Sequence, residues 1–169
     1  MSEPVAAVRS VADLLAVVRR QAEHSADRYD ELAEAFAVAN NLDTEGAFRE
    51  LAEGARLHAA AMPTPTEPPG LLPAWGDLYP EISDPDSVHY LMPPWHAYDL
   101  AQRHEAKALA LIEDTATNSP DPDIRAAAIE LARRQQDRVE AILARRDSLP
   151  QPASGWWEDE DGPNWDSEF

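Results

Sequence analysis

The distribution of proline constrains the fold of this chain more than any other feature. Nine of its 15 prolines lie between Pro63 and Pro94. Proline removes a backbone donor and clashes with the preceding helical turn, so that segment cannot form a continuous helix. The stretches on either side carry apolar residues at helical spacing and no hairpin signal. The chain is therefore expected to be all-α, with one long irregular connection in its middle.

Four helices are predicted, over residues 10–40, 43–62, 94–117 and 121–147. Ser10 is expected to cap the first helix and Asp43 the second, and Asn40 and Asn41 both suit a left-handed end of the first helix. Asp121 followed by proline predicts the start of the fourth. The predicted buried stripes run through Val11, Leu15, Val18, Ala22, Ser25, Tyr29, Leu32 and Phe36; Phe48, Leu51, Ala55, His58 and Met62; Ala97, Ala101, Glu105, Ala108 and Ile112; and Ile124, Ala128, Leu131, Gln135, Arg138 and Ile142.

The lengths of the connections predict how the helices are arranged. Short turns make the first two helices antiparallel neighbours, and likewise the last two. The crossover at 63–94 lets the third helix run parallel to the second. We therefore expect an N-terminal arm (1–9), a four-helix bundle (10–150) and a C-terminal tail (151–169).

Charge and composition exclude several classes of function. The chain has 14 basic and 32 acidic residues and a net charge of −18, which disfavours binding to nucleic acid or to anionic membranes. It has no cysteine, which excludes disulfides and thiolate metal sites. No run of about 18 apolar residues and no signal-peptide pattern occur, so a cytoplasmic location is expected. Glycine-rich phosphate loops and Gly-x-Ser-x-Gly elbows are also missing.

Short motifs in the four helices resemble the rubrerythrin-like branch of the ferritin-like superfamily. They are Tyr29-Asp30-Glu31-Leu32-Ala33, Leu51 to His58, Glu105-Ala106-Lys107-Ala108, and Asp123-Ile124-Arg125 running into Glu130-Leu131-Ala132. The resemblance covers about residues 10–147 and implies a ferritin-like four-helix bundle. It also implies that two copies could pair as a homodimer.

That family holds two metal ions with a Glu from two helices and a Glu-x-x-His pair from the other two. Of the six matching positions, only His58 and Glu105 keep a ligand here. The others are Ala22, Ala55, Gln135 and Arg138. Alanine cannot coordinate, and a guanidinium stays protonated. No cofactor is therefore expected.

We expect Arg138 to pair with Glu105, because a buried carboxylate needs a positive partner. Gln135 or His58 would complete the hydrogen bonds of this core polar cluster. The alternative is a nonstandard site for iron or another divalent metal, built from His58 and Glu105 with Glu23, His24 or Glu53. For His58, a satisfied core histidine is the default interpretation.

Other histidines and aromatics have ordinary interpretations. His89, His96 and His104 are expected at the surface or in loops. Trp75, Trp95 and Tyr98 are expected to cover the outside of the bundle.

The tail differs in character from the bundle. It contains six acidic residues, no basic ones, and the aromatics Trp156, Trp157, Trp165 and Phe169. Such a segment suits docking on another protein, or on its own bundle.

Two function classes follow. The first is a non-catalytic ferritin-like protein that works through protein–protein contact, as an assembly factor, adaptor or cargo. The alternative is a rubrerythrin-like metal-dependent oxidoreductase or peroxidase with a nonstandard site. The eroded ligand set favours the first, and the enzymatic alternative stays open.

Overall fold

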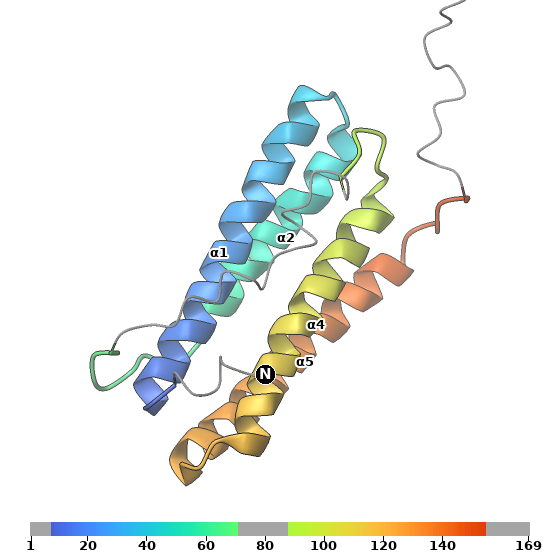
Figure 1. Ribbon diagram of the computed structural model, residues 1–169. Coiled ribbons are helices and arrows are strands. Elements are labelled where there is room, and N and C mark those ends of the chain that lie inside the picture. Colours follow the sequence, from blue (N-terminus) through green and yellow to red (C-terminus); the bar gives the residue numbers. More distant parts are fainter. Residues whose placement is uncertain (1–7, 71–87, 155–169) are drawn as a thin grey trace, which may run out of the picture.

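The computed structural model describes residues 8–70 and 88–154, and within these ranges it contains helices and no strand. The helices are α1 (Val11–Val38), α2 (Leu42–Ala60), α4 (Pro94–Asn118) and α5 (Pro122–Asp147). Each predicted helix is present, with its ends within two residues of the prediction. Figure 1 shows two helical hairpins, α1–α2 and α4–α5, lying side by side as a four-helix bundle.

The turn between α1 and α2 depends on two asparagines. Asn40 has a φ of 56°, the left-handed conformation expected for it. Asn41 is the N-cap of α2, and its side-chain oxygen accepts a hydrogen bond of 3.2 Å from the backbone N–H of Thr44. The predicted cap, Asp43, is wrong. It lies inside the first helical turn, where its negative charge still favours the helix N-terminus.

The other helix starts follow their sequence signals. The Ser10 hydroxyl accepts from the backbone N–H of Asp13 at the start of α1. Pro94 occupies the first turn of α4. Asp121 caps α5 by accepting from the N–H groups of Asp123 and Ile124.

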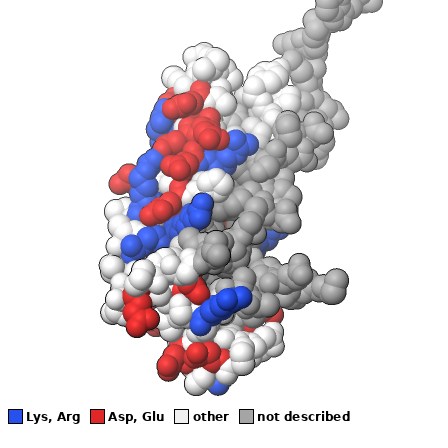
Figure 2. All heavy atoms as spheres, turned by 60° about the vertical axis from the view of Figure 1, so that its left-hand side comes forward, with Lys and Arg blue, Asp and Glu red and all other residues white. Residues whose placement is uncertain are grey.

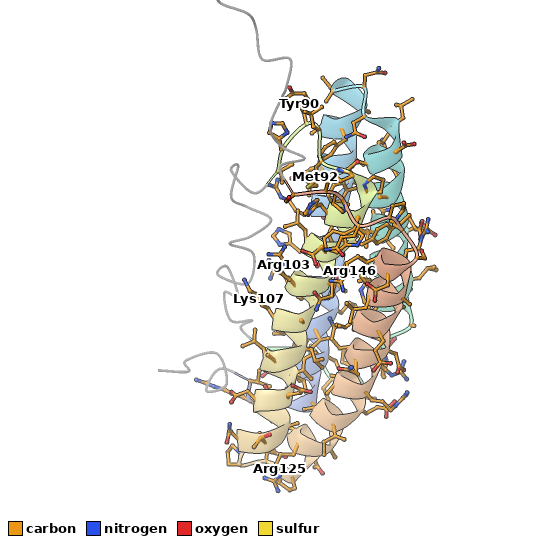
Figure 3. The ribbon with its side chains drawn as sticks, turned by 90° about the vertical axis from the view of Figure 1, so that its right-hand side faces the viewer. Tyr90, Met92, Arg103, Lys107, Arg125 and Arg146 are labelled. Carbon is orange, nitrogen blue, oxygen red and sulfur yellow. The ribbon has the colours of Figure 1, made fainter. Side chains whose placement is uncertain are left out.

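The two described ends of the connection between α2 and α4 contact opposite ends of α1. Near its start, Gly70 donates its N–H to Asp13 Oδ1 at 2.7 Å. At its end, Asn41 Nδ2 donates to the carbonyls of Tyr90 and Met92, both at 3.0 Å. Tyr90 and Met92 lie at the end of the bundle opposite Arg125 in Figure 3. This crossover makes α4 parallel to α2, as predicted, although its middle (71–87, with Trp75) lies outside the described residues.

The core is aromatic near the α1–α2 turn. Phe48 stacks on Phe36 at 5.5 Å between ring centroids and on Tyr29 at 6.3 Å. Tyr98 joins the same cluster and is only 2% exposed. Tyr98 was predicted to cover the outside of the bundle, and this is wrong. Like its neighbour Ala97, Tyr98 is buried on the inner side of α4. Trp95 is only partly buried, and the guanidinium of Arg146 lies 5.1 Å from its ring.

None of the helices in the described residues is long and apolar enough to cross a bilayer.

Candidate functional site

Glu105 is the centre of the candidate site. It lies on the inner face of α4 and is only 1% exposed. It belongs to a stripe otherwise made of small and apolar residues, including Ala101 and Ala108. A carboxylate in such surroundings must be hydrogen-bonded or take up a proton.

Three side chains donate to the Glu105 carboxylate. Arg138 Nη2 and the hydroxyl of Tyr29 each lie 3.2 Å from Oε1. Gln135 Nε2 donates to Oε2 at 2.8 Å and to the backbone carbonyl of Glu105 at 3.1 Å. Both carboxylate oxygens therefore have donors, and one donor is a permanent cation.

His58 completes the cluster from α2. Because the amide nitrogen of Gln135 faces the carboxylate, its oxygen accepts from His58 Nε2 at 3.0 Å. The structure thus brings together the four residues of the core polar cluster, His58, Glu105, Gln135 and Arg138. It adds Tyr29, which sequence reasoning placed on the buried stripe of α1 without a polar role.

The cluster sets the protonation of its members. Burial by itself would raise the pKa of Glu105, but the charges of Arg138 and His104 and the hydrogen bond from Gln135 hold that pKa below its usual value. Burial, and then the charge of Arg138, lowers the pKa of His58. The site therefore favours an ionised Glu105 and a neutral His58.

A second buried polar group adjoins Glu105. His104 was predicted at the surface, and this is wrong: it is 2% exposed, with Nε2 lying 2.9 Å from the hydroxyl of Ser25. Ser25 in turn accepts from Gln21 Nε2 at 3.2 Å. Ser25 and Tyr29 are one helical turn apart on the predicted stripe of α1, and that spacing is the signal that could have placed both beside α4.

The substitute ligands considered from the sequence do not join the cluster. Glu23, His24 and Glu53 are all exposed on the outer faces of α1 and α2. His89 and His96 are partly buried near the start of α4. The tail aromatics Trp156, Trp157, Trp165 and Phe169 lie outside the described residues.

The described residues do not fit the metal pair that the resemblance implies. Ala22 and Ala55 are buried at 1% and 0% exposure, so methyl groups stand where carboxylates would be needed. The guanidinium of Arg138 contacts the one inward carboxylate. Among residues 8–70 and 88–154, no three side chains of His, Cys, Asp or Glu come together so as to hold a metal ion.

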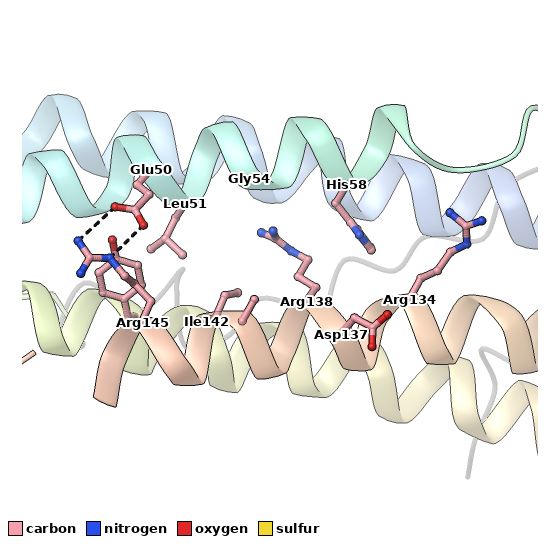
Figure 4. A pocket seen from close by; sticks show the side chains of 11 residues that line it. Glu50, Leu51, Gly54, His58, Arg134, Asp137, Arg138, Ile142 and Arg145 are labelled. Carbon is pink, nitrogen blue, oxygen red and sulfur yellow. Dashed lines mark hydrogen bonds and ion pairs between the residues drawn. The ribbon is translucent and has the colours of Figure 1, made fainter. Parts of the chain in front are cut away.

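A cleft of about 400 Å³ opens beside the cluster, between α2 and α5 (Figure 4). His58 and Arg138 point into it from opposite helices. Gly54 faces Arg138, and a Cβ added there would lie 3.2 Å from Arg138 Nη1. The absence of a side chain at Gly54 therefore makes room for the guanidinium.

Comparison with known proteins supports the fold. A solved structure of an uncharacterized conserved protein from Magnetospirillum magnetotacticum MS-1 is similar to this chain, with a TM-score of 0.55 and 26% sequence identity. The similarity covers 86% of this chain and 99% of that one. No family model and no curated protein matches the sequence. The chain is an all-α, ferritin-like four-helix bundle.

Replacing Arg138 by Leu should destabilise the protein by about 3–5 kcal/mol, because it leaves Glu105 buried without its cation. Adding Glu105→Gln should recover much of that loss, since the neutral amide needs no cation. Chemical denaturation of the three proteins measures both effects.

Arg133→Leu is the matched control, because Arg133 lies on the same helix with its side chain 60% exposed. It should change the free energy of unfolding by less than about 0.5 kcal/mol. If Arg138→Leu costs no more than Arg133→Leu, the buried pair does not support the core.

Stability should also depend on pH through His58. Its pKa is lower in the folded protein than in the unfolded chain, so its contribution is fully present above about pH 6.5 and is lost as the pH falls toward the folded pKa. The free energy of unfolding, measured between pH 8 and 5, should therefore decrease with falling pH.

In His58→Asn this decrease in the free energy of unfolding should be smaller. Part of the decrease should remain, because burial also lowers the pKa of His96. The exposed His24→Gln serves as the control and should keep the decrease of the unmodified protein. Identical pH profiles for His58→Asn and the unmodified protein would show that His58 is not buried in neutral form.

Proposed function

We propose that this protein is a non-catalytic ferritin-like bundle that acts through contact with another protein. One observation carries the proposal: the guanidinium of Arg138 occupies the inner seam of the bundle and contacts Glu105. In the family that the sequence resembles, two metal ions take this place. A guanidinium has no lone pair to offer a metal, so it can replace a cation but not bind one.

The remaining ligand groups are already engaged. Both oxygens of Glu105 accept hydrogen bonds, and His58 donates to Gln135. Binding a metal at this seam would require the Arg138 guanidinium to leave a place where its side chain is only 9% exposed. Moving it out would cost the buried ion pair, which supports a structural role for the cluster.

A surface at one end of the bundle supports the contact role. Four large apolar side chains there are more than two-fifths exposed: Val38 (90%), Leu42 (62%), Tyr90 (50%) and Leu91 (41%). The hydrogen bond from Asn41 to the Tyr90 carbonyl brings the α1–α2 turn beside residues 90 and 91. We call this the end surface. Apolar patches of this kind are typical of protein–protein contact sites.

The charged surface is of a different kind. On the face shown in Figure 2, acidic and basic side chains are intermixed rather than gathered by sign. Arg49 and Arg56 of α2 both pair with Asp30 of α1, for example. Such pairs contribute little to stability individually. Because these charges are paired within the bundle, the features that suit a partner are the end surface and the acidic, Trp-containing tail.

Metal binding provides the first test. The purified protein, exposed to Fe(II), Mn(II) and Zn(II) and then passed through a desalting column, should retain far less than stoichiometric metal. A variant that restores the family's ligands should gain metal by the same measurement, because the backbone already provides the bundle geometry. Its substitutions are Ala22→Glu, Ala55→Glu, Gln135→Glu and Arg138→His.

Stoichiometric metal in the unmodified protein, lost in Glu105→Gln, would overturn the proposal. It would instead favour the rubrerythrin-like oxidoreductase or peroxidase, with iron or another divalent metal at a nonstandard site.

The contact role predicts a complex that depends on the end surface or the tail. A tagged chain, cross-linked in cells of its source, should capture a protein in constant ratio, and sedimentation will show whether that partner is a second copy. Val38→Ser with Leu42→Ser, or Trp156→Ala with Trp157→Ala, should abolish the capture.

Ile129→Ser is the matched control, since Ile129 is 63% exposed on α5 and lies outside the end surface. Capture that all variants retain equally would contradict the proposed contact surfaces.

A further inference from the structure

We propose that the cleft between α2 and α5 is the docking site for the chain's own acidic tail, with an indole from Trp156 or Trp157 and carboxylates from residues 158–161. This inference does not depend on whether the protein binds metal. It uses the tail that the proposed function also offers to a partner, so a tail held in the cleft leaves the end surface as the contact with another protein.

The cleft is apolar in its interior and carries charges of both signs along its rim, with more basic than acidic side chains. Leu51, Tyr98, Ala141 and Ile142 supply most of its apolar lining. Arg134, Arg138 and Arg145 are spaced one turn and then two turns apart on α5 and line its length (Figure 4). Glu50 and Asp137 line it too, and Glu50 pairs with Arg145. A volume of about 400 Å³ suits an aromatic side chain next to a few polar groups.

One buried donor in this region has no partner. Arg138 Nε is buried without a hydrogen bond in the described part of the chain. Arginine is always protonated. This donor therefore calls for an occupant that brings an acceptor, and a carboxylate is the strongest acceptor in proteins. The Tyr98 hydroxyl is a different case, because burial and then a hydrogen bond with Glu50 raise its pKa to about 12.

Charge complementarity identifies the tail as that occupant. Helix α5 carries six basic and five acidic residues, and three arginines against two carboxylates line the cleft, within a protein of net charge −18. The tail has six acidic residues and no basic one. Its run Trp156-Trp157-Glu158-Asp159-Glu160-Asp161 places aromatic rings directly before four carboxylates. That order matches an apolar interior bordered by arginines.

The tail can also reach the cleft. Helix α5 ends at Asp147, two residues after Arg145 at one end of the cleft. Trp157 follows ten residues later, and an extended chain of that length spans about 33 Å. From Arg145 back to Arg134 the helix rises over 11 residues, about 16 Å. The tail can therefore turn back along α5 within one chain.

Distance measurements between spin labels test the proposal in the full chain. Because the protein has no cysteine, Ala60→Cys and Gly162→Cys introduce unique labelling sites without removing any native thiol. Ala60 is exposed near the Arg134 end of the cleft, since Arg134 Nη1 bonds the carbonyl of Ala61. Docking should give a narrow distribution of short distances, which broadens at high salt as the charges are screened.

Charge reversal supplies the controls. Arg134→Glu with Arg145→Glu should broaden the distribution, and adding Glu158→Lys with Glu160→Lys should narrow it again. Arg133→Glu with Arg20→Glu changes the net charge equally outside the cleft and should leave the distribution narrow.

Two outcomes would overturn the proposal. One is a broad distribution in the unmodified chain, or one that charge reversal in the cleft does not change. The other is a short distance between singly labelled chains after mixing, which would make the tail of a second copy the occupant. Circular dichroism of each variant confirms that the bundle is intact.

Discussion

The buried carboxylate of Glu105 is the constraint on which the interior of this bundle depends. A charge at 1% exposure is tolerated only with a counter-charge and filled hydrogen bonds, and here these come from different helices. Tyr29 reaches it from α1, and Gln135 and Arg138 from α5. His58 connects α2 through Gln135. One side chain of α4 thus links all four helices, and a change in the register of any of them would leave a polar group unsatisfied.

This network adds direction to the apolar packing between the two hairpins, part of which is made by small residues. Ala22, Ala55 and Ala128 are buried along the seam, and alanine allows helices to approach closely without fixing their register. Apolar packing alone would permit several arrangements of similar energy. Directional hydrogen bonds at Glu105 select one of them. The space for Arg138 in turn depends on Gly54, because any side chain there would begin 3.2 Å from the guanidinium.

The sequence predicts the architecture well because the architecture rests on local signals. Helical spacing, proline positions and the lengths of the turns determine the four helices, their pairing and the crossover. The contact between Arg138 and Glu105 also follows, since both lie on predicted stripes and a buried carboxylate needs a cation. The functional meaning of the contact between Arg138 and Glu105 stays a prediction. The cap at Asn41 was missed because Asn41 and Asp43 lie two residues apart and both residue types cap helices well. The partners of His104 were missed because they depend on which surfaces face each other across helices. Helical periodicity gives the inner face of one helix but not the atoms opposite it.

Under the proposed function, charge balance would explain why several residues at the expected ligand positions differ together from the family's ligands. Two divalent cations in a bundle are balanced by about four carboxylates. A single guanidinium balances the charge of one carboxylate. Under the proposed function, Arg138 can therefore support Glu105 alone, and any further inward carboxylate at residues 22, 55 or 135 would remain uncompensated in a low-dielectric interior. The residues at these three positions are Ala22, Ala55 and Gln135, and all three are neutral. Under the proposed function, each neutral residue therefore makes sense only together with the other two and with Arg138. A single reversion toward the family's ligands would add charge without adding a metal site.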